Sequence, residues 1–208
     1  MVTHGLTART EPRLQADSPS PHRDAAQTGQ RLAGLASHSL LMMTTRDGWQ
    51  LDAVEAAVTR ISELARSSDL AEPVPHLNRW KVRDVVAHLG GVHRWAIRIV
   101  TDRSMAGPGF KKSTLDGREL CNWFDSGADE LLALLRATPL DDPCPNFNPG
   151  SDGHVEFWAR RQAHEATVHR WDVEKALGCT TVIDPALAAD GIDEFLDVFV
   201  RTRGKQTL

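Results

Sequence analysis

The chain has 208 residues, which is enough for one domain with a sizeable core, since single domains cluster at roughly 100–200 residues. Its 24 basic and 28 acidic residues are interspersed and give a net charge of −4, so there is no basic stripe to bind nucleic acid phosphates. No apolar run reaches the ~20 residues of a membrane-spanning helix, and we expect a cytoplasmic protein with neither a membrane nor nucleic acid as partner.

The first 44 residues are rich in Ser, Thr, Pro, Gln and Arg and have no sustained apolar period. Such a segment cannot offset the entropy cost of ordering by burying apolar surface. We therefore expect residues 1–44 to be a disordered extension, residues 45–203 to fold as a helical bundle, and residues 204–208 to form a short tail. The pair Met42–Met43 leaves open a later translation start.

Beyond the extension, apolar residues recur at steps of three and four, which is the period of an amphipathic α-helix. This period predicts five helices, over residues 47–68, 82–103, 118–137, 154–177 and 183–203. Loops rich in Pro, Gly and Asn separate them, and no segment has the short β-branched alternation of strands. The predicted fold is all-α: a four-helix bundle with a long crossover connection and an additional C-terminal helix.

The cysteines, Cys121, Cys144 and Cys179, are odd in number and widely scattered. This spacing argues against a disulfide framework and against a CxxC metal knuckle. We interpret all three as free thiols.

One face of the fourth predicted helix carries aromatic and ionisable side chains together. At the helical period that face reads Trp158, Gln162, Glu165, His169 and Asp172. Glu165 and His169 are one turn apart and could reach a single ion, although such a pair alone is more often a weak surface contact. We also expect this helix to bury Trp158, Val168 and Trp171.

A third candidate ligand lies on the apolar face of the second predicted helix. His88 shares that face with Val85 and Trp95. A lone histidine there is more often a hydrogen-bonded core residue than a metal ligand. Gly90 and Gly91 follow it directly, and glycine allows another backbone or a ligand to approach closely.

Two stretches, "WKVRDVVAHLGGVHRWA" (80–96) and "FWARRQAHEATVHRWDVEKALG" (157–178), together resemble the mycothiol-dependent maleylpyruvate isomerase family. The N-terminal metal-binding domain of that family is a DinB-like helical bundle. The resemblance runs over residues 45–201. It implies that His88, Glu165 and His169 coordinate a divalent metal, which is usually zinc in the family.

The resemblance also implies a chemistry. Two histidines and a glutamate leave one position open on a tetrahedral ion, where mycothiol, the small thiol of actinobacteria, would bind as a thiolate. The thiolate would add to an electrophilic substrate such as maleylpyruvate and so allow its isomerisation, or would be transferred to the electrophile. Arg161 could receive a substrate carboxylate, pair with Glu165 or lie on the surface. Asp172 could orient His169 or be an exposed carboxylate.

Two features depart from the family pattern. Thr or Ser generally follows the Trp of the first motif as an N-cap, whereas this chain has Lys81, so we expect that helix to fray or to be capped by Asn78. Many members continue into a C-terminal α/β domain that helps cover the metal cleft, and this sequence ends at "RGKQTL". Two alternatives stay open: a non-catalytic metal-binding or regulatory module, and a metal-free bundle. We expect a monomer or a homodimer.

Overall fold

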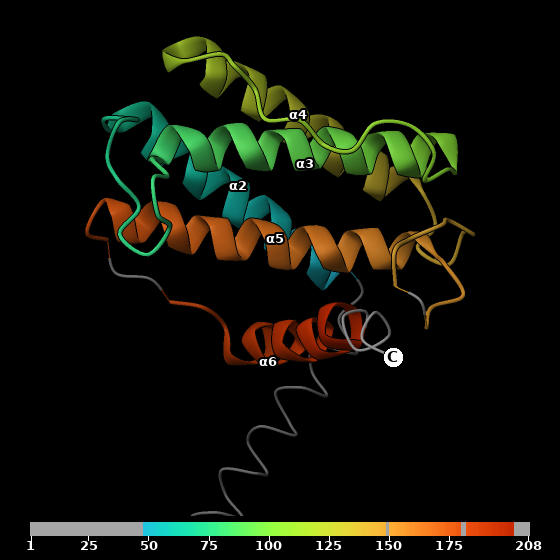
Figure 1. The fold of residues 1–208 in the computed structure, drawn as a ribbon. Helices are drawn as coiled ribbons and strands as arrows, with labels where there is room; N and C mark the ends of the chain where they lie inside the picture. Colours follow the sequence, from blue (N-terminus) through green and yellow to red (C-terminus); the bar gives the residue numbers. More distant parts are fainter. Residues whose placement is uncertain (1–47, 149, 180–181, 202–208) are drawn as a thin grey trace, which may run out of the picture. The chain divides into compact units, whose positions relative to one another are not determined.

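The computed structural model describes residues 48–148, 150–179 and 182–201, and the regular structure within them is helical (Figure 1). The helices are α2 (Trp49–Ser67), α3 (Val82–Asp102), α4 (Gly117–Ala137), α5 (Val155–Ala176) and α6 (Pro185–Glu194), and α6 runs on into a π-helical turn, η1 (Phe195–Val200). No strand forms within this part of the chain, so the all-α prediction is confirmed. The expected extension, residues 1–44, and the expected tail, residues 204–208, lie outside the described residues.

Helices α2 to α5 form the predicted four-helix bundle. Both α2 and α3 pack against α4 and α5. Because α4 and α5 therefore occupy opposite corners, the chain crosses the bundle between them, through a connection described over residues 138–148 and 150–154. None of the described helices combines the length and apolarity needed to cross a membrane, and all three cysteines are free thiols.

The bundle core is built from the apolar stripes that the sequence predicts. Its largest fully buried side chains include Trp158, Phe124, Ile61, Leu89, Ile99, Leu120, Leu131 and Leu135. Burying one such side chain stabilises the fold by about 1.5–3 kcal/mol. Helix α5 buries the largest share of the polar residues in the described core, namely Gln162, His164, Thr167, Asp172 and Glu174.

The start of α3 is ordered without the cap that the sequence suggested. Helix α3 begins directly after Lys81, and the Asp84 carboxylate accepts a hydrogen bond from the Lys81 backbone N–H at 3.0 Å. The expectation of a frayed start or a cap by Asn78 is therefore wrong. An acidic residue in the first turn satisfies one of the N–H groups that the helix leaves free.

Two glycines let other elements pack directly on α3. A Cβ atom at Gly90 would lie 2.4 Å from the Trp123 ring of α4, and one at Gly91 would lie 2.3 Å from the Lys111 carbonyl oxygen. No larger residue fits at either position unless its neighbour moves. The connection of residues 103–116 consequently lies flat along α3, next to His88.

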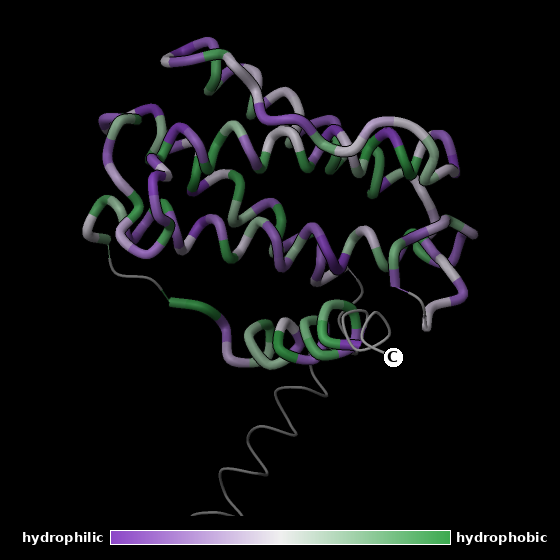
Figure 2. Tube along the Cα trace, viewed as in Figure 1, coloured by the Kyte–Doolittle hydropathy of each residue, from purple (hydrophilic) through white to green (hydrophobic). Residues whose placement is uncertain are grey.

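Helix α6 packs on α5 through its polar side. Asp190 lies 2.8 Å from Nε of Arg160 and 2.6 Å from Nε2 of His164, and Glu194 pairs with Arg161. The apolar side chains of α6 and η1 that are exposed are Ile192, Phe195, Leu196, Phe199 and Val200. Figure 2 shows the hydrophobic character of this segment.

The expected burial of α5 side chains is correct in part. Trp158 is fully buried and Trp171 is partly buried, but Val168 is 54% exposed. Val168 faces the side of α5 where α6 lies, and α6 contributes Asp190 and Glu194 to that contact while most of its large apolar side chains stay exposed. Val168 is therefore left uncovered beside a cavity of about 380 Å³ that it shares with Leu187 and Phe195.

Candidate metal centre

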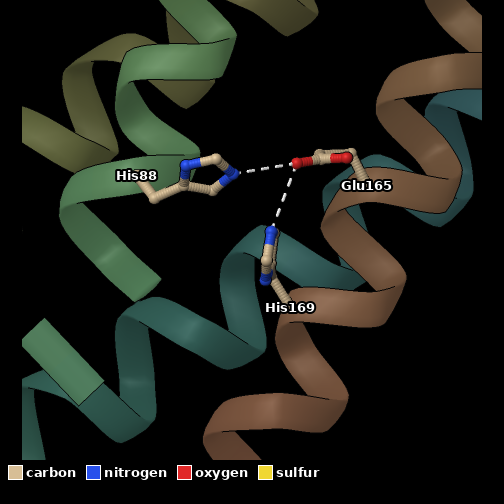
Figure 3. Close-up of side chains that lie close together, drawn as sticks. All are labelled: His88, Glu165 and His169. Carbon is tan, nitrogen blue, oxygen red and sulfur yellow. Dashed lines mark hydrogen bonds and ion pairs between the residues drawn. The ribbon is translucent and has the colours of Figure 1, made fainter. Parts of the chain in front are cut away.

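Two helices bring His88, Glu165 and His169 together, as Figure 3 shows. His88 comes from α3, and the other two residues come from α5. Nε2 of His88 lies 3.1 Å from Oε1 of Glu165, and Nε2 of His169 lies 3.2 Å from the same oxygen. All three candidate ligand atoms lie within 4.8 Å of one another.

The donor set and its spacing fit a divalent ion. Two imidazoles and one carboxylate are ligands that zinc prefers, and two atoms that each lie 2.0–2.1 Å from a tetrahedral zinc are roughly 3.3 Å apart. The two nitrogen–oxygen distances, 3.1 and 3.2 Å, are close to that value. The side chains are 14, 18 and 12% exposed for His88, Glu165 and His169, so the cluster is largely shielded yet reachable from solvent.

A family model described as the mycothiol maleylpyruvate isomerase N-terminal domain matches residues 51–174. The match spans more than half of the chain and includes all three residues of the cluster. The chain belongs to this family. No curated protein and no solved structure gives a significant match.

One candidate ligand, His169, has a well-defined outer partner. Oδ2 of Asp172 lies 2.7 Å from Nδ1 of His169, and Oδ1 of Asp172 lies 2.7 Å from Nε2 of His76. Asp172 is buried, so it contacts His169 and is not the exposed carboxylate of the alternative interpretation. Such a partner fixes the imidazole orientation, with Nε2 directed toward Oε1 of Glu165.

His76 was not recognised from the sequence. It lies in the connection between α2 and α3, 96 positions from Asp172, and no periodic pattern relates the two residues. The other candidate ligand, His88, lacks a comparable partner, because its Nδ1 is buried without a hydrogen bond among the described residues. The two histidines of the cluster are therefore held differently.

The electrostatics of the cluster favour charged groups. Burial alone would raise the pKa of Glu165, but hydrogen bonds from His169 and His88 and the charge of Arg161 hold that pKa well below its usual range. Burial would lower the pKa of His169, yet hydrogen bonds to Asp172 and Glu165 raise it to about 9. At neutral pH the His169 imidazole of the metal-free cluster is therefore positively charged. An ion that binds to Nε2 would have to displace the proton there.

Arg161 pairs with two carboxylates at once. Its Nη2 contacts Oε2 of Glu165 and its Nη1 contacts Oε2 of Glu194. Its side chain is mostly buried. Of the three roles foreseen for Arg161, the structure shows the salt bridge with Glu165. Glu194 itself was not identified from the sequence as part of this region.

Aromatic side chains form the rim of the cluster. The Trp80 ring is stacked near His169, with ring centroids 6.3 Å apart, and meets His88 edge-on at 5.2 Å. Phe110 meets His88 edge-on at 4.8 Å. Trp80 and Phe110 come from the connections before and after α3, so the loops as well as the helices shape access to the cluster.

A basic groove of about 540 Å³ lies on the other side of Phe110. Its basic lining residues are Arg94, Arg98, Lys111 and Lys112, and no acidic residue lines it. Arg94 donates to the carbonyl oxygens of Gly90 and Trp123 rather than to a carboxylate. Its positive charge is thus left without a neutralising partner at contact distance among the described residues. These four residues, spread over a helix and a loop, gave no sequence signal.

Proposed function

We propose that His88, Glu165 and His169 bind one divalent ion, zinc, at which a small-molecule thiol, mycothiol, reacts with a small electrophile. The observation that carries this proposal is the convergence of the three donor atoms within 4.8 Å, from two helices, at a partly open position. Membership of the mycothiol maleylpyruvate isomerase family supports the choice of thiol. Three protein ligands leave a coordination position free, which is the arrangement of catalytic zinc sites.

A zinc ion at this position would lower the pKa of a thiol that binds to it, so that the thiolate is available as nucleophile at neutral pH. The protein residues provide the conditions for this. Nε2 of His88 and Nε2 of His169 both face Oε1 of Glu165, and both atoms would have to be free of a proton to bind an ion, while Asp172 would keep the other His169 proton on Nδ1. Trp80 and Phe110 pack against the His88 ring at the rim.

The proposed reaction is a reversible thiol addition to an activated cis double bond. The sulfur–carbon bond forms, the former double bond rotates as a single bond, and elimination of the thiolate gives the trans isomer. No oxidant or reductant is needed, because the same bond forms and breaks. Transfer of the thiol to the electrophile is the same first step, after which the resulting enolate takes a proton from water instead of eliminating the thiolate.

The basic groove is the part of the surface best suited to the negative charge of a carboxylate substrate. Arg94, Arg98, Lys111 and Lys112 line it, and it borders the cluster at Phe110. Arg161 is a weaker candidate for the same task, because both of its terminal nitrogens already contact carboxylates. We therefore assign Arg161 a role within the metal site rather than in contact with substrate.

The test is cobalt substitution followed by a thiol titration. Stoichiometric cobalt should bind to the wild-type protein, and millimolar mycothiol should add an intense sulfur-to-metal charge-transfer band in the near ultraviolet. A variant with both His88→Ala and His169→Ala should bind no stoichiometric metal, whereas His154→Ala, outside the cluster, should behave as wild type.

Any other result of the cobalt and thiol experiment would contradict the proposal or favour one of the two alternative functions. Metal that persists in the double histidine variant would remove the proposed site. A wild-type protein that binds no metal would favour a bundle in which both histidines are hydrogen-bonded core residues. Bound metal without the thiolate band and without isomerase turnover would favour a non-catalytic metal-binding module.

A further inference from the structure

A chain of ionic contacts connects α6 with the candidate metal cluster. Glu194 on α6 pairs with Arg161 on α5, and Arg161 pairs in turn with Glu165. Glu194 is only 2% exposed, and Arg161 is 13% exposed at its side chain. Charges this well shielded from water interact more strongly than surface ion pairs.

The two oxygens of Glu165 have different partners. Oε1 faces both histidines, at 3.1 and 3.2 Å, whereas Oε2 contacts Arg161. The carboxylate is therefore held in one orientation, with a single oxygen directed toward the position of an ion. A glutamate that is free to rotate could offer both oxygens instead.

Arg161 also places a positive charge next to the site of a cation, which by itself would weaken metal binding. Glu194 contacts the same guanidinium through Nη1, so it offsets that charge. It also fixes Arg161 from the side opposite to Glu165, which keeps Nη2 on Oε2. Both effects come from a residue that does not contact the cluster.

We propose that Glu194 is a positioning residue for the metal site. It holds Arg161 against Glu165 so that Glu165 offers one oxygen to the ion, and it neutralises the guanidinium that would otherwise repel the ion. The inference rests on the proposed function, because it assumes that Glu165 is a ligand. It extends the site from the matched region of α5 to α6, beyond residue 174.

A neighbouring ion pair provides a matched control. Arg160 precedes Arg161 on α5, and it pairs with Asp190 of α6 at 2.8 Å. That pair joins the same two helices and also involves His164, but neither Arg160 nor Asp190 contacts Glu165. Loss of the Arg160–Asp190 pair therefore tests the attachment of α6 alone.

The experiment compares Glu194→Gln with Asp190→Asn in the full chain. Zinc affinity is measured by competition with a chromophoric chelator, and the geometry of the site is read from the visible d–d absorption of the cobalt-loaded protein. Glu194→Gln should lower zinc affinity on the order of 10–100-fold, as loss of an outer partner of a ligand does, and should change the cobalt spectrum. Asp190→Asn should lower the melting temperature but leave affinity and spectrum unchanged.

A double variant separates the two effects of Glu194. A protein with both Arg161→Gln and Glu194→Gln has no guanidinium to repel the zinc ion. It should therefore bind zinc more tightly than the protein with Glu194→Gln alone. Its cobalt spectrum should still differ from wild type, because Glu165 is no longer held. Far-ultraviolet circular dichroism checks that each variant keeps its helices.

Two results would overturn the inference while leaving the metal site intact. One is a Glu194→Gln protein with wild-type affinity and cobalt spectrum. The other is an equal loss of affinity in Glu194→Gln and Asp190→Asn, which would mean that only the attachment of α6 matters. A wild-type protein without metal would instead remove the proposed function, and this inference with it.

Discussion

Nε2 of His88 and Oε1 of Glu165 lie 3.1 Å apart, although the two residues are 77 positions apart in the chain and belong to different helices. The candidate metal site therefore joins α3 to α5 across the bundle. An ion bound there would hold the two helices together in the folded state and would lose that arrangement on unfolding. Metal binding and the stability of the bundle should consequently be coupled.

Zinc should raise the melting temperature of the protein. A ligand present at about 100 times its Kd stabilises the folded state by about 2.7 kcal/mol, which corresponds to roughly 5–10 °C for a chain of this size. Differential scanning fluorimetry with zinc and with a chelator measures the shift. His88→Ala should abolish it, and His154→Ala should keep it; an equal shift in both variants would mean that the ion binds elsewhere.

Zinc affinity should rise with pH until about pH 9. The pKa of His169 in the metal-free protein is about 9, so below that pH the ion must displace one proton, and log affinity should rise by about one unit per pH unit. The curve should level off above pH 9, because His169 is then neutral. Calorimetry in buffers of different ionisation enthalpy counts the protons released.

Asp172→Asn is the matched variant for that pH dependence. The Asp172 carboxylate raises the pKa of His169, so in Asp172→Asn zinc affinity should stop rising at a lower pH than in wild type. The limiting affinity at high pH should also be weaker, because His169 loses its charged partner at Nδ1. Glu174→Gln, which changes another buried carboxylate of α5, should leave the shape of the curve unchanged. A wild-type affinity independent of pH between 6 and 9 would contradict this account.

Gly91→Ala should destabilise the protein and displace the loop beside the cluster. The new Cβ atom would lie 2.3 Å from the Lys111 carbonyl oxygen, a backbone atom that cannot move without the loop. Overpacking of this kind costs about 1–3 kcal/mol. Gly109→Ala lies in the same loop with no atom within 4 Å of the added Cβ, so chemical denaturation should show no loss for it. Equal stability of the two variants would show that the loop is not fixed by Gly91.

Replacing Lys111 and Lys112 by Gln should raise the KM for an anionic electrophile without a comparable change in kcat. Lys111 and Lys112 line the groove beside Phe110, and Nζ of Lys112 lies over the Trp80 ring. Neither ammonium group pairs with Glu165, so both should act on substrate binding. Steady-state kinetics with charged and neutral electrophiles separates this effect from general loss of activity. Lys175→Gln is the control, since Lys175 also lies over a tryptophan ring, that of Trp171, away from the groove.

The helical period was sufficient to predict most of the bundle and to place Glu165 and His169 on one face of α5. That face is recognisable because ligands one turn apart in a helix stay neighbours whatever the helix packs against. His88 required the motif resemblance, because a lone histidine in an apolar stripe does not reveal its partner on another helix.

Other parts of the site had no local signal. His76 contacts Asp172 from the loop between α2 and α3, and Glu194 contacts Arg161 from α6. The positions of that loop and of α6 depend on tertiary contacts. The apolar period of residues 183–203 predicts a helix but does not tell which of its faces packs on α5. Ion pairs of Asp190 and Glu194 with α5 direct its acidic side inward, so Phe195 and Leu196 stay exposed.

The position of Trp80 should make its intrinsic fluorescence sensitive to the state of the cluster. Its indole lies against both His88 and His169 and beneath the ammonium group of Lys112, which is 3.4 Å from the ring centroid. A protonated imidazole quenches indole emission, so Trp80 fluorescence should be weak while His169 is protonated. It should rise when an ion displaces that proton. We therefore expect tryptophan fluorescence to rise when an ion fills the site, above the emission of the other five of the six tryptophans.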